Sequence, residues 1–140
     1  MSPKGAVMIC GHGSRDERAV SQFNAMVETM KQTHLADYDV GFLEFAHPIQ
    51  RDGFEKLKAM GHKKIYALPG MLFAAGHVKN DLPSEVNNFA HENPDIDVKF
   101  GRDLAIDPKL LRASADRIEE ALATADDSIS RKDTLLMVVG

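Results

Sequence analysis

Short apolar runs alternate with amphipathic stretches along most of this 140-residue chain. The runs have the length and continuous apolar character of buried parallel strands: residues 5–10, 38–45, 63–69 and 95–100. The other stretches carry apolar residues at helical spacing: residues 15–33, 48–61, 78–89 and 107–122. Strands that alternate with helices predict a parallel sheet with helices on both faces. We therefore predict an α/β fold, a flavodoxin-like sheet of four to five strands, and favour the strand order 2-1-3-4.

Capping residues mark the helix boundaries, and the pattern changes near the end of the chain. Ser14 is the expected N-cap of the first helix, and Asp107 is that of the last, which begins at Pro108. We expect one domain over residues 5–123, a polar linker over 124–133 and a strand over 134–140. That last run lands on glycine as the first strand does, so it is either a fifth strand or the first strand of a missing repeat.

Composition excludes several classes of protein. The net charge is −4 and no lysine or arginine tract stands out, which argues against a nucleic-acid partner. No apolar stretch approaches the roughly 20 residues that a membrane span needs. The single cysteine, Cys10, excludes an internal disulfide and is expected as a buried thiol. These features predict a cytoplasmic protein.

Potential metal ligands follow the first three predicted strands. His12 comes directly after the first strand, Glu44 ends the second, and His77 lies in the loop after the third. Sites in parallel α/β sheets form beyond the carboxyl ends of the strands, so these side chains are expected to converge. Two imidazoles and a carboxylate suit first-row divalent ions and leave coordination positions open for chemistry.

Each ligand has a structural alternative. A histidine in a turn, such as His12, is often a surface residue, and His77 could simply cap the third helix. Glu44 is less ordinary, because a carboxylate between Leu43 and Phe45 at an apolar strand end needs a partner or a shifted pKa. His47 could face the same cavity as a further metal contact.

Three motifs resemble one known family over residues 5 to 122. They are "GHGSR" (11–15), "FLEFAHP" (42–48) and the longer "LPGMLFAAGHVKNDLP" (68–83). In these motifs the chain is similar to the sirohydrochlorin cobaltochelatase family, the CbiX-like class II chelatases. The third motif is the more specific, whereas "GHGS" alone would be weak.

The resemblance implies ATP-independent insertion of Co²⁺ into sirohydrochlorin, a step of anaerobic cobalamin synthesis. It implies that His12 and His77 bind the metal and help remove the pyrrole protons, with Glu44 as ligand or proton acceptor. No cofactor is implied beyond the substrate metal ion. Short members of the family are homodimers and long members carry two such domains. The strand-like ending suggests the N-terminal half of a long member, which would self-associate or pack against a second chelatase domain.

The substrate implied by this resemblance carries eight carboxylates, so cations are expected at the rim of the site. Arg15, Arg51 and Lys79 lie next to the three motifs, and each could equally be an ordinary surface charge. Glycines would keep the rim low enough for a flat substrate. The predicted substrate-binding set is therefore Gly11, Gly13, Ser14, Arg15, Arg51, Gly76 and Lys79.

Other functions remain open at this point. A metal or tetrapyrrole carrier would use the same ligands without turnover, and the ligand set does not separate cobalt from nickel or iron. Phosphate chemistry is disfavoured because "GHGSRDE" matches neither the Walker pattern nor G-x-G-x-x-G, and no arginine precedes His12. A serine hydrolase is disfavoured because Ser14 does not sit in G-x-S-x-G.

Overall fold

The computed structural model describes residues 5–33, 36–72, 76–125 and 130–137, with only the backbone at residues 77 and 78. The chain divides into two compact units, Met1–Ala105 and Ile106–Gly140. No helix in these described ranges is both long and apolar enough to cross a membrane. Each unit is described separately below.

The first unit is built on a four-stranded parallel sheet. Its strands are β1 (Ala6–Gly11), β2 (Asp37–Phe42), β3 (Lys64–Pro69) and β4 (Asp97–Phe100). They lie in the order β2-β1-β3-β4, which confirms the predicted order 2-1-3-4. β1 and β3 occupy the centre, so the loops that follow β1, β2 and β3 leave neighbouring positions on one edge of the sheet.

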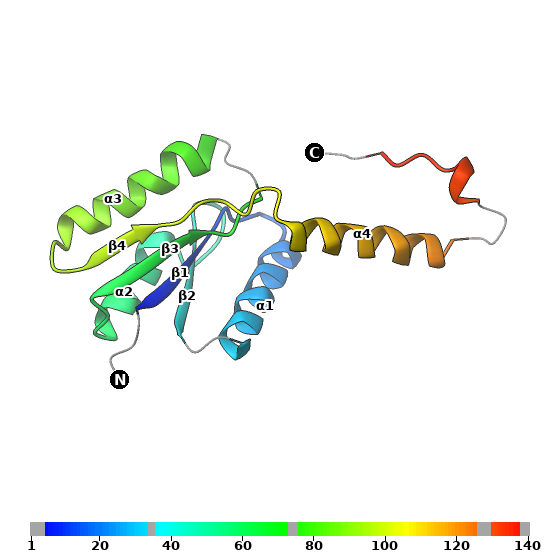
Figure 1. Ribbon diagram of the computed structural model, residues 1–140. Helices are drawn as coiled ribbons and strands as arrows, with labels where there is room; N and C mark the ends of the chain where they lie inside the picture. The colour runs from blue at the N-terminus through cyan, green and yellow to red at the C-terminus, as the bar shows by residue number, and fades with distance from the viewer. Residues whose placement is uncertain (1–4, 34–35, 73–75, 126–129, 138–140) are drawn as a thin grey trace. The chain divides into compact units, whose positions relative to one another are not determined.

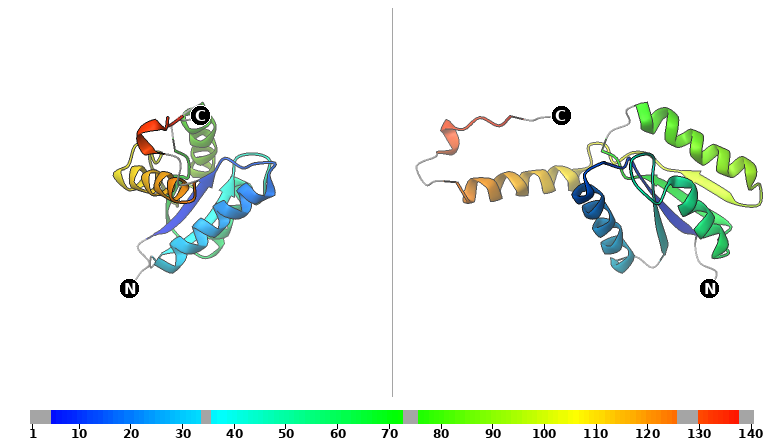
Figure 2. Two further views of the ribbon diagram at one scale, coloured as in Figure 1. Left: turned by 90° about the vertical axis from the view of Figure 1, so that its right-hand side faces the viewer. Right: turned by 180° about the vertical axis from the view of Figure 1, so that it is seen from behind.

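Helices cover both faces of this sheet, as predicted. α1 (Glu17–Thr33) lies on one face, and α2 (Gln50–Ala59) and α3 (Leu82–Glu92) lie on the other (Figures 1 and 2). The main core lies between the sheet and the second pair, where the rings of Phe54 and Phe89 stack with centroids 4.8 Å apart. The apolar stripes of α2 and α3 therefore face the sheet, as their spacing predicted.

Several boundaries in the first unit differ from the sequence-based expectation: α3 begins at Leu82 after a π-helix and β4 begins at Asp97, and two further differences lie beside the candidate site. β2 ends at Phe42 rather than at residue 45, because the chain turns away and Phe45 adopts a left-handed backbone with φ of 61°. α1 begins at Glu17, so Ser14 lies too early to cap it. Asp16 takes that role and accepts a hydrogen bond from the Arg18 amide at 2.9 Å. The Ser14 hydroxyl instead accepts from the amide of Asp16 at 3.0 Å.

The second unit contains α4 (Pro108–Ala123) and a 3₁₀ turn, Arg131–Asp133. Asp107 caps α4 as expected, since its carboxylate accepts from the Lys109 amide at 2.8 Å. The strand expected over 134–140 does not form at residues 134–137, where Leu135 and Met137 are exposed and no neighbouring strand pairs with them among the described residues. Residues 138–140 lie outside the described ranges, and a second repeat starting here stays a prediction.

Candidate metal-binding site

The loops after β1 and β2 are joined by backbone hydrogen bonds. The Leu43 amide donates to the Gly11 carbonyl at 2.9 Å, and the Glu44 amide donates to the His12 carbonyl at 3.0 Å. These bonds continue the β1–β2 pairing, in which Gly11 lies opposite Phe42, for two residues beyond the strands. The backbone therefore fixes His12 and Glu44 side by side.

Gly13 makes this close approach possible. Its φ of +94° is a conformation that other residues rarely adopt, and a Cβ there would lie 1.7 Å from the Glu44 carbonyl oxygen. Gly11 is also crowded, because its Cβ would lie 2.8 Å from the Phe42 ring. A Cβ at Gly76, in contrast, would meet no described atom within 4 Å. Crowding thus explains Gly11 and Gly13, and it does not explain Gly76.

His12 and Glu44 face each other with a geometry that suits a bound cation. The Nε2 atom of His12 lies 3.3 Å from Oε1 of Glu44, and the two side chains are 41% and 37% exposed. The other ring nitrogen, Nδ1, lies 3.0 Å from the Gly13 carbonyl oxygen, to which it can only donate. A neutral His12 then directs the lone pair of Nε2 towards the carboxylate, as in metal-binding histidines whose second nitrogen donates to a carbonyl. A proton or a metal ion can bridge the two groups.

His77 begins a π-helix, His77–Asp81, that leads into α3. Such turns are rare and often occur at functional sites. Its side chain lies outside what the structure describes. Among the described side chains no group of three His, Cys, Asp or Glu residues could hold a metal ion. A third ligand from His77 therefore stays a prediction.

The three cationic residues predicted at the rim of the site have different surroundings in the structure. Arg15 lies over the ring of Phe45, with its guanidinium carbon 4.6 Å from the ring centroid. Arg51 forms ion pairs with Glu92 on α3 and with Glu55 on its own helix, the latter at 3.6 Å. Its guanidinium therefore ties two helices together. Lys79 is exposed on the π-helix.

Three cavities are lined by residues of the loops after β1 and β2, and one of them is lined by His12. One of about 160 Å³ lies beside His12 and Ser14, with an apolar floor that includes Phe42. A second, of about 330 Å³, is lined by Arg15 and His47 among others, and a third, of about 140 Å³, reaches Arg51. His47 thus lines a different cavity from His12, although the two cavities share Ser14.

Gln50 is a positioning residue that the sequence did not reveal. Its amide nitrogen donates to the carbonyls of Gly41 at 2.7 Å and Gly11 at 3.3 Å, and the side chain is buried. It therefore joins the ends of β1 and β2, one residue before His12 and three residues before Glu44. A polar residue in the first turn of a helix is ordinary, so no local signal marks it.

Cys10 lies two residues before His12, at the end of β1, and its thiol is buried. Burial excludes this thiol as a metal ligand. Desolvation raises its pKa to about 12, so the neutral thiol dominates at physiological pH. We expect a thiol reagent such as 5,5′-dithiobis(2-nitrobenzoic acid) to label native protein at least about 100-fold more slowly than protein unfolded in guanidinium chloride. Rapid labelling of the native protein would show that Cys10 is accessible and reopen its role.

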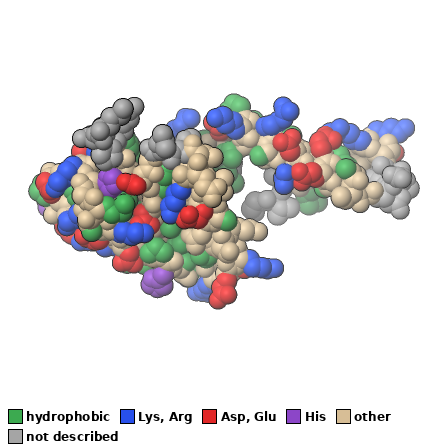
Figure 3. Space-filling model, turned by 90° about the horizontal axis from the view of Figure 1, so that it is seen from below, with side chains coloured by type: hydrophobic (Ala, Val, Ile, Leu, Met, Phe, Trp, Pro, Cys, Tyr) green, Lys and Arg blue, Asp and Glu red, His purple; other side chains and the backbone are tan. Residues whose placement is uncertain are grey.

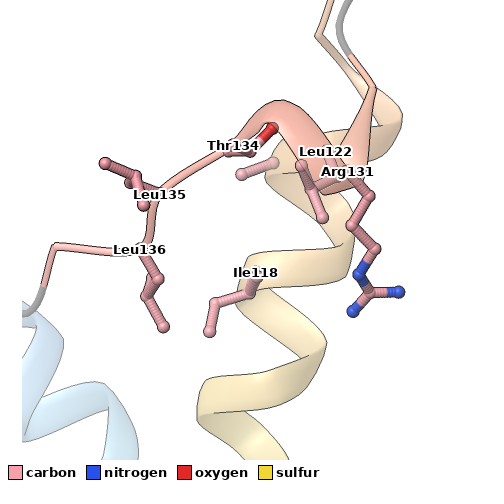
Figure 4. A pocket seen from close by; sticks show the side chains of 7 residues that line it. Ile118, Leu122, Arg131, Thr134, Leu135 and Leu136 are labelled. Atoms are coloured by element: carbon pink, nitrogen blue, oxygen red, sulfur yellow. The ribbon is translucent and has the colours of Figure 1, made fainter.

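A larger cavity lies in the second unit and offers different chemistry. It has a volume of about 480 Å³ and is lined mainly by aliphatic side chains of α4 and of Leu135 and Leu136 (Figure 4). The charged side chain among its described lining residues, Arg131, is ion-paired with Glu119. The surface seen in Figure 3 has acidic and basic side chains interspersed. Neither feature competes with the His12–Glu44 pair as a metal site.

Comparison with known proteins finds one family model and relatives that are named as sirohydrochlorin chelatases. The CbiX family model matches residues 6–121. A sirohydrochlorin ferrochelatase of Bacillus subtilis is 30% identical over 84% of this chain and 45% of its own length. A sirohydrochlorin cobaltochelatase of Methanothermobacter thermautotrophicus is 26% identical over 86% of this chain and 94% of its own length.

A solved structure agrees with these relatives. The sirohydrochlorin chelatase SirB from Bacillus subtilis subspecies spizizenii, in complex with cobalt, superposes with a TM-score of 0.79 at 31% identity. The match covers 82% of this chain and 50% of SirB. The chain thus spans about half the length of the Bacillus proteins and nearly the whole of the Methanothermobacter one.

Proposed function

Because the chain belongs to the CbiX family, we propose that it inserts a divalent metal ion into sirohydrochlorin without ATP. The observation that carries this proposal is the pairing of His12 Nε2 with Glu44 at 3.3 Å while Nδ1 is engaged by the Gly13 carbonyl. This imidazole and this carboxylate, held by two joined loops, are two of the three protein ligands that we propose for an open metal site. We propose His77 as the third ligand, from the π-helix after β3.

The reaction requires the tetrapyrrole to lose two protons as the ion enters its ring. Neutral imidazoles bind the ion without adding charge and can accept protons near neutral pH. In this scheme His12 and His77 first hold the substrate metal, and as the ion passes to the ring, the nitrogen atoms that release it take up the two pyrrole protons. Glu44 offsets the charge of the ion or passes a proton to solvent, since it is partly exposed beside His12.

We propose Co²⁺ as the physiological metal, in cobalamin synthesis in the cytoplasm. Relatives are named for cobalt and for iron, and imidazole with carboxylate ligands follows the general divalent series. We also propose that the chain works as a homodimer or against a second chelatase domain, because it spans about half of the Bacillus relative. Arg15, Lys79 and Arg51 are the proposed contacts for the substrate carboxylates.

The test is an anaerobic insertion assay with metal-free sirohydrochlorin and Co²⁺, Fe²⁺ or Ni²⁺, followed by absorbance. We expect product well beyond one equivalent per chain, at a rate above the protein-free background and greatest with Co²⁺. Product that stops at one equivalent would show a carrier rather than an enzyme. A greater rate with Fe²⁺ or Ni²⁺ would overturn the choice of cobalt alone.

Glu44→Gln separates the two roles proposed for the carboxylate. The amide keeps the size of the side chain and removes its charge and basicity. If Glu44 accepts a proton, kcat should fall by about 10²–10⁴-fold while the Kd for Co²⁺ changes little. If it is mainly a ligand, calorimetry should show weaker Co²⁺ binding. If Glu44→Gln leaves both kcat and the Kd for Co²⁺ unchanged, Glu44 has neither of the two proposed roles.

A further inference from the structure

Phe45 is an exposed aromatic residue in an unfavourable backbone conformation. Its φ of 61° lies in the left-handed region, which is costly for a bulky residue, and its side chain is 53% exposed. A glycine or asparagine would meet the backbone requirement more easily. Neither the core nor the turn therefore accounts for a phenyl ring at this position, directly after Glu44.

The ring is held by a neighbouring cation. The guanidinium of Arg15 lies over one face of Phe45 at 4.6 Å from the centroid, and both residues line the cavity of about 330 Å³. Arg15 follows the His12 loop and Phe45 follows Glu44. The pair therefore joins the two loops that carry the metal ligands.

Other apolar side chains are exposed beyond the same ends of the strands. Leu72, which follows β3, is 55% exposed, and Leu104, which follows β4, is 40% exposed. Backbone hydrogen bonds connect these two segments, with the Leu104 amide donating to the Met71 carbonyl at 2.9 Å. Exposed apolar side chains thus follow β2, β3 and β4, at the ends of the strands where binding sites form in parallel α/β sheets.

We propose that Phe45 and Arg15 form a binding platform for the rim of the tetrapyrrole substrate, which rests on the function proposed above. The phenyl ring contacts the conjugated macrocycle, and the guanidinium pairs with a peripheral carboxylate. Because Phe45 is adjacent to Glu44, this contact places the macrocycle next to the His12–Glu44 pair. The strained backbone is retained because it points the ring outward.

The test compares Phe45→Ala, Phe45→Trp and the control Met60→Ala by quenching of the fluorescence of metal-free sirohydrochlorin. Met60 is a suitable control because it is 54% exposed and lies at the end of α2, outside the described lining of the site cavities. We expect Phe45→Ala to raise the Kd by about 10-fold, as loss of a stacking contact does, and Phe45→Trp to restore it. The Kd for Co²⁺ alone should stay unchanged in all three variants.

Phe45→Gly separates substrate binding from stability. It removes the ring and the left-handed strain together, so it should weaken sirohydrochlorin binding as Phe45→Ala does without lowering Tm. Unchanged sirohydrochlorin affinity in Phe45→Ala or Phe45→Gly would overturn the platform. Metal insertion by the unmodified chain tests the proposed function separately, because it does not depend on these variants.

Discussion

His12→Ala is expected to lower the rate of metal insertion by about 10²–10⁴-fold, the range typical of a lost acid–base group. Nε2 of His12 faces Glu44 at 3.3 Å, so the substitution removes the atom that we propose as metal ligand and, after the ion leaves it, as proton acceptor. The side chain is 41% exposed and lies outside the core, so the fold should persist. Steady-state insertion of Co²⁺ into sirohydrochlorin measures the loss, and circular dichroism checks the fold.

His91→Ala is the matched control for this experiment. His91 is an exposed histidine in the last turn of α3, on an element that does not carry the His12–Glu44 pair. Its replacement should leave insertion unchanged. Near-normal turnover in His12→Ala, or an equal loss in His91→Ala, would contradict the role of His12. His77→Ala in the same assay tests the predicted third ligand.

The fold could be predicted because each element carries its own periodicity. Four apolar runs and the amphipathic stretches between them specify a parallel sheet. The alternation favours the observed strand order but does not determine it. The end of β2 could not be predicted, since residues 43–45 remain apolar enough to continue a strand. The loop after β1 bonds to the amides of Leu43 and Glu44, and the chain then turns at Phe45 with a φ of 61°, which no local sequence signal marks.

The positions of candidate site residues could be predicted where they follow directly from the ends of the strands. His12 and Glu44 follow adjacent strands, so the parallel sheet places them on neighbouring loops, and Gly13 then lets these loops approach closely. The pairing of Arg51 with Glu92 was not predictable, because Glu92 lies 41 residues away and meets Arg51 only when α2 packs on α3. The same applies to Gln50, whose carbonyl partners lie at the ends of two strands.

Gly13→Ala is the second substitution with a large expected effect. A Cβ at this position would lie 1.7 Å from the Glu44 carbonyl oxygen, far inside van der Waals contact, and the backbone φ of +94° disfavours alanine independently. The two loops must therefore separate, which breaks the alignment of His12 with Glu44. We expect the free energy of unfolding to fall by at least about 2 kcal/mol and insertion activity to be largely lost.

Gly61→Ala distinguishes the two causes. Gly61 has a φ of +91°, close to that of Gly13, but a Cβ there meets no described atom within 4 Å. Its replacement should cost only about 1 kcal/mol, the penalty of the left-handed backbone, and should leave insertion unchanged. Urea unfolding and the insertion assay measure both effects. If the two variants lose equal stability and Gly13→Ala stays active, contact between the His12 and Glu44 loops does not shape the site.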